Sequence, residues 1–180
     1  MTTRPATPDT AEELPRPLLG EWACLGVIYS TPMHGWAVSV RLRPDGDVGR
    51  VWQQSRPLTY RSIDRLTRRG WIAPVGREPG DAGPNRTILA TTPSGRTRLE
   101  TWAGEPVRHL RDLRSELLLK LVIADLHGFD VTALLEAQRS IVDGHAEALA
   151  ARATTDDVVT LWRLEAARAA QRFIERVVER

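Results

Sequence analysis

Apolar and polar positions fall into blocks along the chain, and these blocks predict a set of helices interrupted by one short hairpin. Residues 18–30 (LLGEWACLGVIYS) are apolar at most positions, which predicts a first helix buried on most sides. Thr31 and Pro32 follow as a cap and a proline at a first helical position, so we expect a second helix over about residues 33–43. Its inward positions are predicted to be Trp36, Val38 or Val40, and Leu42.

A third helix has its own start and stop signals in the segment SRPLTYRSIDRLTRRG. Ser55 can cap the first turn, Pro57 lies where a missing N–H costs nothing, and Gly70 can close the last turn. The apolar side chains expected against the core are Leu58, Ile63 and Leu66, with Tyr60 nearby. Two predicted strands, residues 71–77 and 85–92, then flank a turn-rich segment. Three helices and a hairpin indicate a winged helix-turn-helix.

The second half of the chain is helical in pattern. Thr92 and Pro93 open one helix, and the apolar run of residues 110–126 continues as far as Gly128. Asp130 is then placed to cap a further helix. We therefore expect this half to be almost entirely helical.

A last helix is predicted to start near Asp156 and Asp157, because acidic side chains suit the positive end of a helix dipole. The apolar stripe expected along it consists of Val159, Trp162, Ala166, Ala169, Ala170, Phe173 and Val177. The apolar stripes of the last two helices exceed what a small winged domain can cover. A second copy of the chain is the simplest partner for them.

Charge is distributed unevenly between the halves of this 180-residue chain, although its net charge is only +2. Residues 18–92 carry ten basic and six acidic side chains, whereas residues 93–180 carry thirteen and fourteen. Residues 50–69 alone hold six arginines against one acid, Asp64. Such a cluster is typical of a surface that contacts phosphates, although a solvated arginine face on an ordinary helix has the same pattern.

A basic helix of this kind can enter the major groove of DNA, where arginine reads guanine edges and also binds phosphates. Tyr60 can alternatively pack with its hydroxyl toward a phosphate. The residues expected to contact DNA are Arg56, Thr59, Tyr60, Arg61, Arg65 and Arg68 on the helix, with Arg77 and Arg86 on the wing.

The expected fold is mainly α, with a winged helix-turn-helix of three helices and a two-stranded wing, followed by a helical C-terminal region. We expect a disordered leader over residues 1–17, a DNA-binding domain over 18–92, and a dimerisation and possible effector domain over 93–180. No apolar run approaches the roughly 20 residues that span a bilayer. The leader also lacks the apolar core of a secretory signal, which favours a cytoplasmic protein with no membrane partner.

Enzyme chemistry is not indicated by the sequence. The four histidines are not at metal-ligand spacing with one another or with the single cysteine, Cys24, and no glycine-rich phosphate loop is present. We therefore expect no catalytic residues, no metal and no cofactor. Cys24 lies in an apolar stretch and is expected to be buried.

Four segments of the chain resemble the PadR family of bacterial transcriptional regulators, in order and in spacing. They are LLGEWACLGVIYSTPMHGW, SRPLTYRSIDRLTRRGWI, GPNRTILATTPSGR, and TWAGEPV with LRSELLLKLVIAD. His34-Gly35-Trp36 matches the family's His-Gly-aromatic motif, and Tyr60 matches its recognition-helix tyrosine. The chain departs from the family pattern at Pro57, Asn85, Leu89 and Thr91.

The resemblance implies a homodimer whose C-terminal helices form the interface and whose recognition helices enter successive major grooves of a pseudo-palindromic operator. It also implies repression controlled by an aromatic or planar small molecule. Trp102 and Trp162 are the candidate contacts for such an effector, whereas Trp22, Trp36, Trp52 and Trp71 are expected in the core of the winged domain. The alternative function is a protein-interaction adaptor that retains the winged fold without reading DNA.

Overall fold

The computed structural model describes residues 15–80, 85–152 and 157–179. Most of the predicted leader, residues 1–14, lies outside this described part, as does Asp156. The helices are α1 (Leu19–Ile28), α2 (Gly35–Arg41), α3 (Arg56–Arg68), α4 (Pro93–Gly104), α5 (Leu118–His127), α6 (Thr132–Ala150) and α7 (Val158–Val178). The strands are β1 (Met33–His34), β2 (Ile72–Glu78) and β3 (Arg86–Thr91), and a 3₁₀ turn (Leu110–Asp112) and a π turn (Leu113–Leu117) precede α5.

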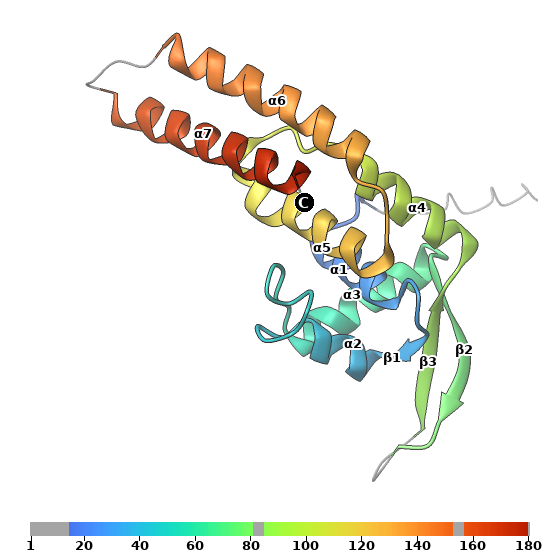
Figure 1. Cartoon of the computed structure of the whole chain (residues 1–180). Helices are drawn as coiled ribbons and strands as arrows, with labels where there is room; N and C mark the ends of the chain where they lie inside the picture. Colours follow the sequence, from blue (N-terminus) through green and yellow to red (C-terminus); the bar gives the residue numbers. More distant parts are fainter. Residues whose placement is uncertain (1–14, 81–84, 153–156, 180) are drawn as a thin grey trace, which may run out of the picture.

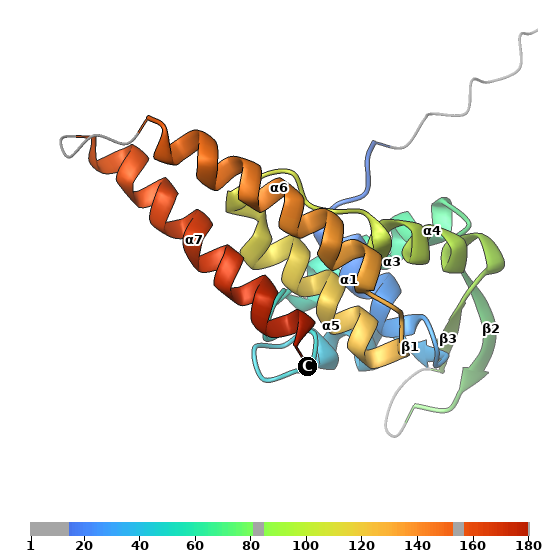
Figure 2. The ribbon, with the colours of Figure 1, turned by 45° about the horizontal axis from the view of Figure 1, so that its top comes forward.

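Helix α1 is the centre of the molecule (Figures 1 and 2). Residues 20–28 are all buried, and α1 contacts α2, α3, α4 and α5. A helix that is apolar on all sides can only be stable when other elements surround it. The first predicted helix is therefore confirmed, and it links the winged part of the chain to the C-terminal helices.

The second helix differs from its prediction at its start. Met33 and His34 form strand β1, which pairs with Leu89 and Ile88 of β3, and α2 begins only at Gly35. The cap is not Thr31 but His34, whose Nδ1 accepts a hydrogen bond of 3.0 Å from the backbone N–H of Ala37. The sequence prediction was wrong here because the pairing partner of β1 lies more than fifty residues away.

The wing is a three-stranded antiparallel sheet in the order β1-β3-β2, and not the predicted two-stranded hairpin. The pairing of β2 with β3 shifts register between Pro74 and Gly76. Figure 1 shows the wing projecting from one end of the molecule, with the α6–α7 hairpin at the other. The expected fold class, a mainly helical winged helix-turn-helix followed by further helices, is confirmed apart from this added strand.

The C-terminal helices begin and end where capping chemistry predicts. The Thr92 hydroxyl accepts a hydrogen bond from the Gly95 N–H at the start of α4 (3.1 Å), and Gly128 ends α5 with a positive φ of 68°. Asp130 accepts from the Thr132 N–H just before α6, and Asp157 accepts from two N–H groups of the first turn of α7. Local side-chain hydrogen bonds fix these boundaries.

The face that α7 buries is not the predicted one. Leu164, Ala167 and Ile174 are buried, and Ile174 packs with Leu135 and Val142 of α6. The predicted stripe instead lies largely on the surface: Trp162 is 74% exposed, and Val159 and Phe173 are also exposed. The helix therefore presents one apolar face to α6 and leaves a second one uncovered.

No helix in the described part of the chain is long and apolar enough to cross a membrane.

Candidate nucleic-acid interface

Helix α3 is held against the core by one narrow face. Thr59, Ser62, Ile63 and Leu66 are its buried residues, and they recur at the three- and four-residue spacing of a single helix face. Gly70 follows the helix with a φ of +69°, a conformation that glycine adopts without strain, and so turns the chain into β2. The remaining faces of α3 carry its arginines.

Two residues of α3 differ from the prediction in whether they lie in the core or on the surface. Leu58 was expected in the core but is 50% exposed, because it is one position away from the buried stripe. Thr59 was expected to face DNA but is fully buried, and its hydroxyl donates to the Ser55 carbonyl at 3.1 Å. Thr59 therefore stabilises the first turn of α3 and does not present its side chain to a ligand.

Three arginines of α3 are exposed as predicted. Arg56 lies at the start of the helix with its guanidinium 5.8 Å from the ring centroid of Tyr60, which is itself exposed. Arg61 and Arg68 extend into solvent and form no ion pair with any other residue in the described part of the chain. Arg56, Tyr60 and Arg61 thus occupy the first two turns of α3.

Arg65, by contrast, is engaged inside the protein. Its guanidinium lies 3.2 Å from one carboxylate oxygen of Glu21 on α1, and Arg69 lies 3.0 Å from the other. Glu21 is only 1% exposed, so the two arginines neutralise a carboxylate that has almost no contact with water. The predicted groove-facing role of Arg65 is corrected by this placement. The available signal was the single acid in the apolar segment of residues 18–30.

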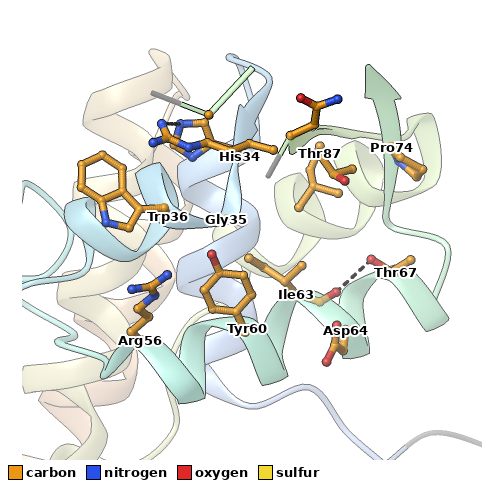
Figure 3. A pocket seen from close by; sticks show the side chains of 14 residues that line it. His34, Gly35, Trp36, Arg56, Tyr60, Ile63, Asp64, Thr67, Pro74 and Thr87 are labelled. Carbon is orange, nitrogen blue, oxygen red and sulfur yellow. Dashed lines mark hydrogen bonds between the residues drawn. The ribbon is translucent and has the colours of Figure 1, made fainter. Parts of the chain in front are cut away.

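A cleft of about 820 Å³ separates α3 from the wing and the start of α2 (Figure 3). Arg56 and Tyr60 extend into it from α3 toward Trp36 and His34 on the opposite wall. The cleft is lined by His34, Gly35, Trp36, Arg56, Tyr60, Ile63, Asp64, Thr67, Pro74, Gly80, Asn85, Arg86, Thr87 and Leu89. It therefore joins residues predicted for DNA contact on both the helix and the wing.

The opposite wall of the cleft is organised by His34. Its Nδ1 accepts from Ala37, so the proton of the neutral ring is on Nε2, which lies 3.0 Å from a carboxylate oxygen of Glu78 on β2. A guanidinium nitrogen of Arg86 on β3 lies 3.5 Å from the same Nε2. His34 thus connects the start of the helix-turn-helix to both long strands of the wing.

Trp36 was expected in the core but is 43% exposed. The Arg86 guanidinium lies 5.7 Å from its ring centroid, which is within the range of a cation–π contact. Sequence reasoning missed both Trp36 and Glu78 as residues of this surface. The family motif that contains Trp36 was the signal that could have identified it.

Gly35 is required by the close approach of α2 to α3. A Cβ atom at this position would lie 2.9 Å from a ring carbon of Tyr60 and 3.2 Å from the Ile63 methyl group. Any larger side chain would displace Tyr60 from the cleft.

The other predicted wing residue, Arg77, is exposed on β2 opposite Thr87 of β3.

The two candidate effector contacts, Trp102 and Trp162, lie in different environments. Trp102 is buried and stacks on Trp22, with ring centroids 4.8 Å apart, so it belongs to the core and not to an open pocket. Trp162 lines a separate groove of about 950 Å³ between the α6–α7 hairpin and the 3₁₀ and π turns. The arginines along that groove are Arg111, Arg114, Arg152 and Arg163.

Metal-ligating side chains do not cluster: across residues 15–80, 85–152 and 157–179, no group of three or more His, Cys, Asp or Glu side chains could hold a metal ion. Cys24 is fully buried, and this burial raises the pKa of its thiol to about 12. The predicted burial of this cysteine is confirmed.

Comparison with known proteins finds no matching family model and no matching curated protein. Among solved structures, PadR of Bacillus subtilis in complex with operator DNA is 15% identical, with a TM-score of 0.46, over 87% of this chain and 96% of that one. The protein smu.1604c of Streptococcus mutans UA159 is 17% identical, with a TM-score of 0.45, over 91% of this chain and 100% of that one. The PadR-like transcriptional regulator BC1756 of Bacillus cereus is 16% identical, with a TM-score of 0.41, over 95% and 98%.

Proposed function

We propose that the protein is a sequence-specific, DNA-binding transcriptional regulator. The observation that carries the proposal is the surface formed by α3 and the wing, where the exposed Arg56 and the half-buried Arg86 line a cleft that also holds two exposed aromatic rings. Duplex DNA carries one negative charge per about 1.7 Å of helix axis, so a surface of this composition is complementary to it. The winged helix-turn-helix fold presents α3 as the element that enters the major groove.

The side chains of this surface divide into two roles. Arg56, Tyr60 and Arg61, in the first two turns of α3, are positioned to reach base edges or the phosphates beside them. Arg68 lies near the end of α3, and Arg77 and Arg86 lie on the wing; they are assigned to the phosphate backbone. Arg65 is left out of this set because Glu21 already binds it.

We further propose that residues 18–92 form the DNA-binding domain and that residues 93–180 form a homodimerisation domain. The uncovered apolar face of α7, which includes Val159 and Phe173, supports a partner whose contact surface is also apolar. A second copy satisfies this condition with the same surface on both sides of a twofold axis. The two copies of α3 would then read two inverted half-sites.

We also propose that the protein represses transcription and that an aromatic effector controls this repression. A repressor of this type occupies its operator until a small molecule stabilises an arrangement with a different separation between the two recognition helices. The groove that contains Trp162 is the candidate effector site, since its tryptophan is exposed and its rim carries four arginines. Trp102 is no longer a candidate because its ring is enclosed by the core.

The test is an electrophoretic mobility shift of the full-length protein with its own upstream intergenic DNA, at two salt concentrations and with excess non-specific competitor. We expect a discrete complex that survives competitor and weakens as salt rises. Arg61→Ala should weaken the complex, and Arg98→Ala, which removes an exposed arginine of α4, is the matched control. Equal affinity of both variants would contradict the assignment of α3. If the folded protein shifts no DNA fragment at either salt, the adaptor function becomes the better account.

A further inference from the structure

Three tryptophans from distant parts of the sequence form one continuous stack. Trp22 of α1 is the shared member: it stacks both with Trp71, which follows α3, and with Trp102 of α4. The ring centroids are 5.2 Å apart for Trp22 and Trp71, and 4.8 Å apart for Trp22 and Trp102, whose planes differ by only 5°. Offset stacking at these distances is favourable and directional, so each ring restricts the orientation of the next.

A cation lies over the ring of each of the two outer tryptophans, Trp71 and Trp102, of this tryptophan stack. The Arg69 guanidinium lies 5.2 Å from the Trp71 ring, and the Lys120 ammonium lies 4.9 Å from the Trp102 ring. Each cation is also bound by an acid, Arg69 by Glu21 at 3.0 Å and Lys120 by Glu116 at 3.2 Å. Cations that are held in place on a ring face gain more from the contact than mobile, hydrated ones.

Lys120 is unusual because it is the only lysine of the chain and is almost completely buried. Its ammonium donates to the Glu105 carbonyl at 2.6 Å, which ties the segment after α4 to α5. The partner Glu116 belongs to the π turn that leads into α5. A buried lysine is costly unless it is paired, so these contacts must form together with the fold.

The other end of the stack is fixed to α3. The backbone N–H of Trp71 donates to the Leu66 carbonyl of α3 at 3.0 Å, and the backbone carbonyl of Trp71 accepts from the Thr92 N–H at the start of α4 at 2.9 Å. Arg69, at the end of α3, spans the Trp71 ring and Glu21. The contacts therefore form an unbroken path from the last turn of α3, through α1 and α4, to α5.

We propose that this cation-capped tryptophan stack couples the last turn of α3 to α5, so that a disturbance at Lys120 loosens residues 65–72. The coupling is a property of the folded chain and goes beyond the proposed function, because it requires neither DNA nor an effector. It provides a physical route by which an event beside the π turn would reach the arginine-bearing helix. Energetic coupling of this kind travels through chains of packed side chains that share contacts.

Amide hydrogen exchange of the full-length protein under native conditions tests the coupling directly, since it reports local opening segment by segment. Lys120→Met keeps the side-chain volume and removes the cation. We expect exchange of residues 65–72 to become about tenfold faster than in the wild type, with α7 as the internal reference for this variant only, because Leu121 packs on the cluster that contains Ile174 of α7. The matched control is Leu121→Ala, which weakens α5 at the neighbouring position where it packs toward the C-terminal clusters.

Coupling must also act in reverse, because a coupling free energy between two sites is reciprocal. Arg69→Gln should therefore accelerate exchange of residues 116–122, and this variant keeps the test valid even if Lys120→Met does not fold. Faster exchange confined to the surroundings of each substitution would overturn the proposal. So would an equal acceleration in all segments, or an effect of Leu121→Ala on residues 65–72 as large as that of Lys120→Met. None of these outcomes depends on whether the protein binds DNA.

Discussion

Glu21 of α1 and Arg65 of α3 form an ion pair of 3.2 Å in which the carboxylate is almost completely buried. Arg69 completes the site on the second carboxylate oxygen. The pair adds a directional contact between α3 and α1 to the buried face of Thr59, Ser62, Ile63 and Leu66. One buried acid thus helps to hold a strongly basic helix against the core.

Glu21→Gln is expected to lower the free energy of unfolding by about 3 kcal/mol, because two partly buried guanidinium groups lose their counter-charge. Arg65→Ala should cost less, since Arg69 still neutralises the carboxylate. Urea denaturation of both variants measures the difference. A change within about 0.5 kcal/mol for Glu21→Gln would mean that the pair contributes no more than a surface contact.

Arg61→Ala and Arg65→Ala should separate DNA contact from structural support. Removal of one phosphate contact lowers the slope of log affinity against log salt concentration by about 0.9, and Arg61 is the exposed member of this pair. We expect the smaller slope for Arg61→Ala only. Fluorescence anisotropy with labelled duplex at four salt concentrations provides the slopes. A slope reduced equally in both variants would argue that Arg65 leaves Glu21 to bind DNA, and a wild-type slope for Arg61→Ala would contradict the assignment of Arg61.

His34→Asn should distinguish the two contacts of His34. Asparagine is a good N-cap, so α2 keeps its cap, whereas the shorter side chain loses Glu78 on the wing. We expect DNA affinity to fall about fivefold, equivalent to about 1 kcal/mol, with thermal stability nearly unchanged. Affinity equal to that of the wild type would show that the wing is positioned without this contact.

Acid should destabilise the protein through His127. Burial, aided by the positive charges of Arg41 and Arg96, lowers the pKa of His127 below its usual 6.5, so the unfolded chain takes up the proton more readily. The free energy of unfolding is therefore highest above about pH 6.5, and it falls as the pH drops from there to the lowered pKa of His127 in the folded state. Thermal melts between pH 7.5 and 5 should therefore show a smaller loss for His127→Gln than for wild type. His145→Gln is the control, and equal pH dependence of the wild type and His127→Gln would contradict the assignment.

Cys24 should be inert toward thiol reagents in the folded protein. Its pKa of about 12 leaves almost no thiolate at pH 8, and its side chain has no access to solvent. Reaction with a chromogenic disulfide should follow unfolding by urea, at the same midpoint as the loss of helix. Fast labelling without denaturant would indicate that α1 opens locally.

Proline and glycine residues made the boundaries of several helices predictable. Pro57 and Gly70 frame α3, and Gly128 ends α5, because proline and glycine act on the backbone within one turn. Long-range partners were not predictable in the same way. Strand β1 depends on β3, and the helix that follows it was consequently misplaced at its start.

The sequence predicted which helix carries the candidate site, but it placed only some of the individual side chains correctly. Arg56, Tyr60, Arg61 and Arg68 are exposed on α3 as expected. Thr59 is not, because a shift of one residue in the buried stripe turns a helix by about 100° and exchanges surface for core. Arg65 could not be assigned either, since its partner Glu21 is forty-four positions away. The tryptophan stack has the same origin: residues 22, 71 and 102 become neighbours only in the folded chain.

The most direct test of the central claim is selection of bound sequences from a random duplex library by the full-length protein. A homodimer that presents two copies of α3 should enrich a pseudo-palindrome whose half-sites are centred about 10 base pairs, or a multiple of this distance, apart. Arg61→Ala should weaken or relax the selected motif. Recovery of no motif by folded, dimeric protein would contradict the claim that α3 and the wing read DNA.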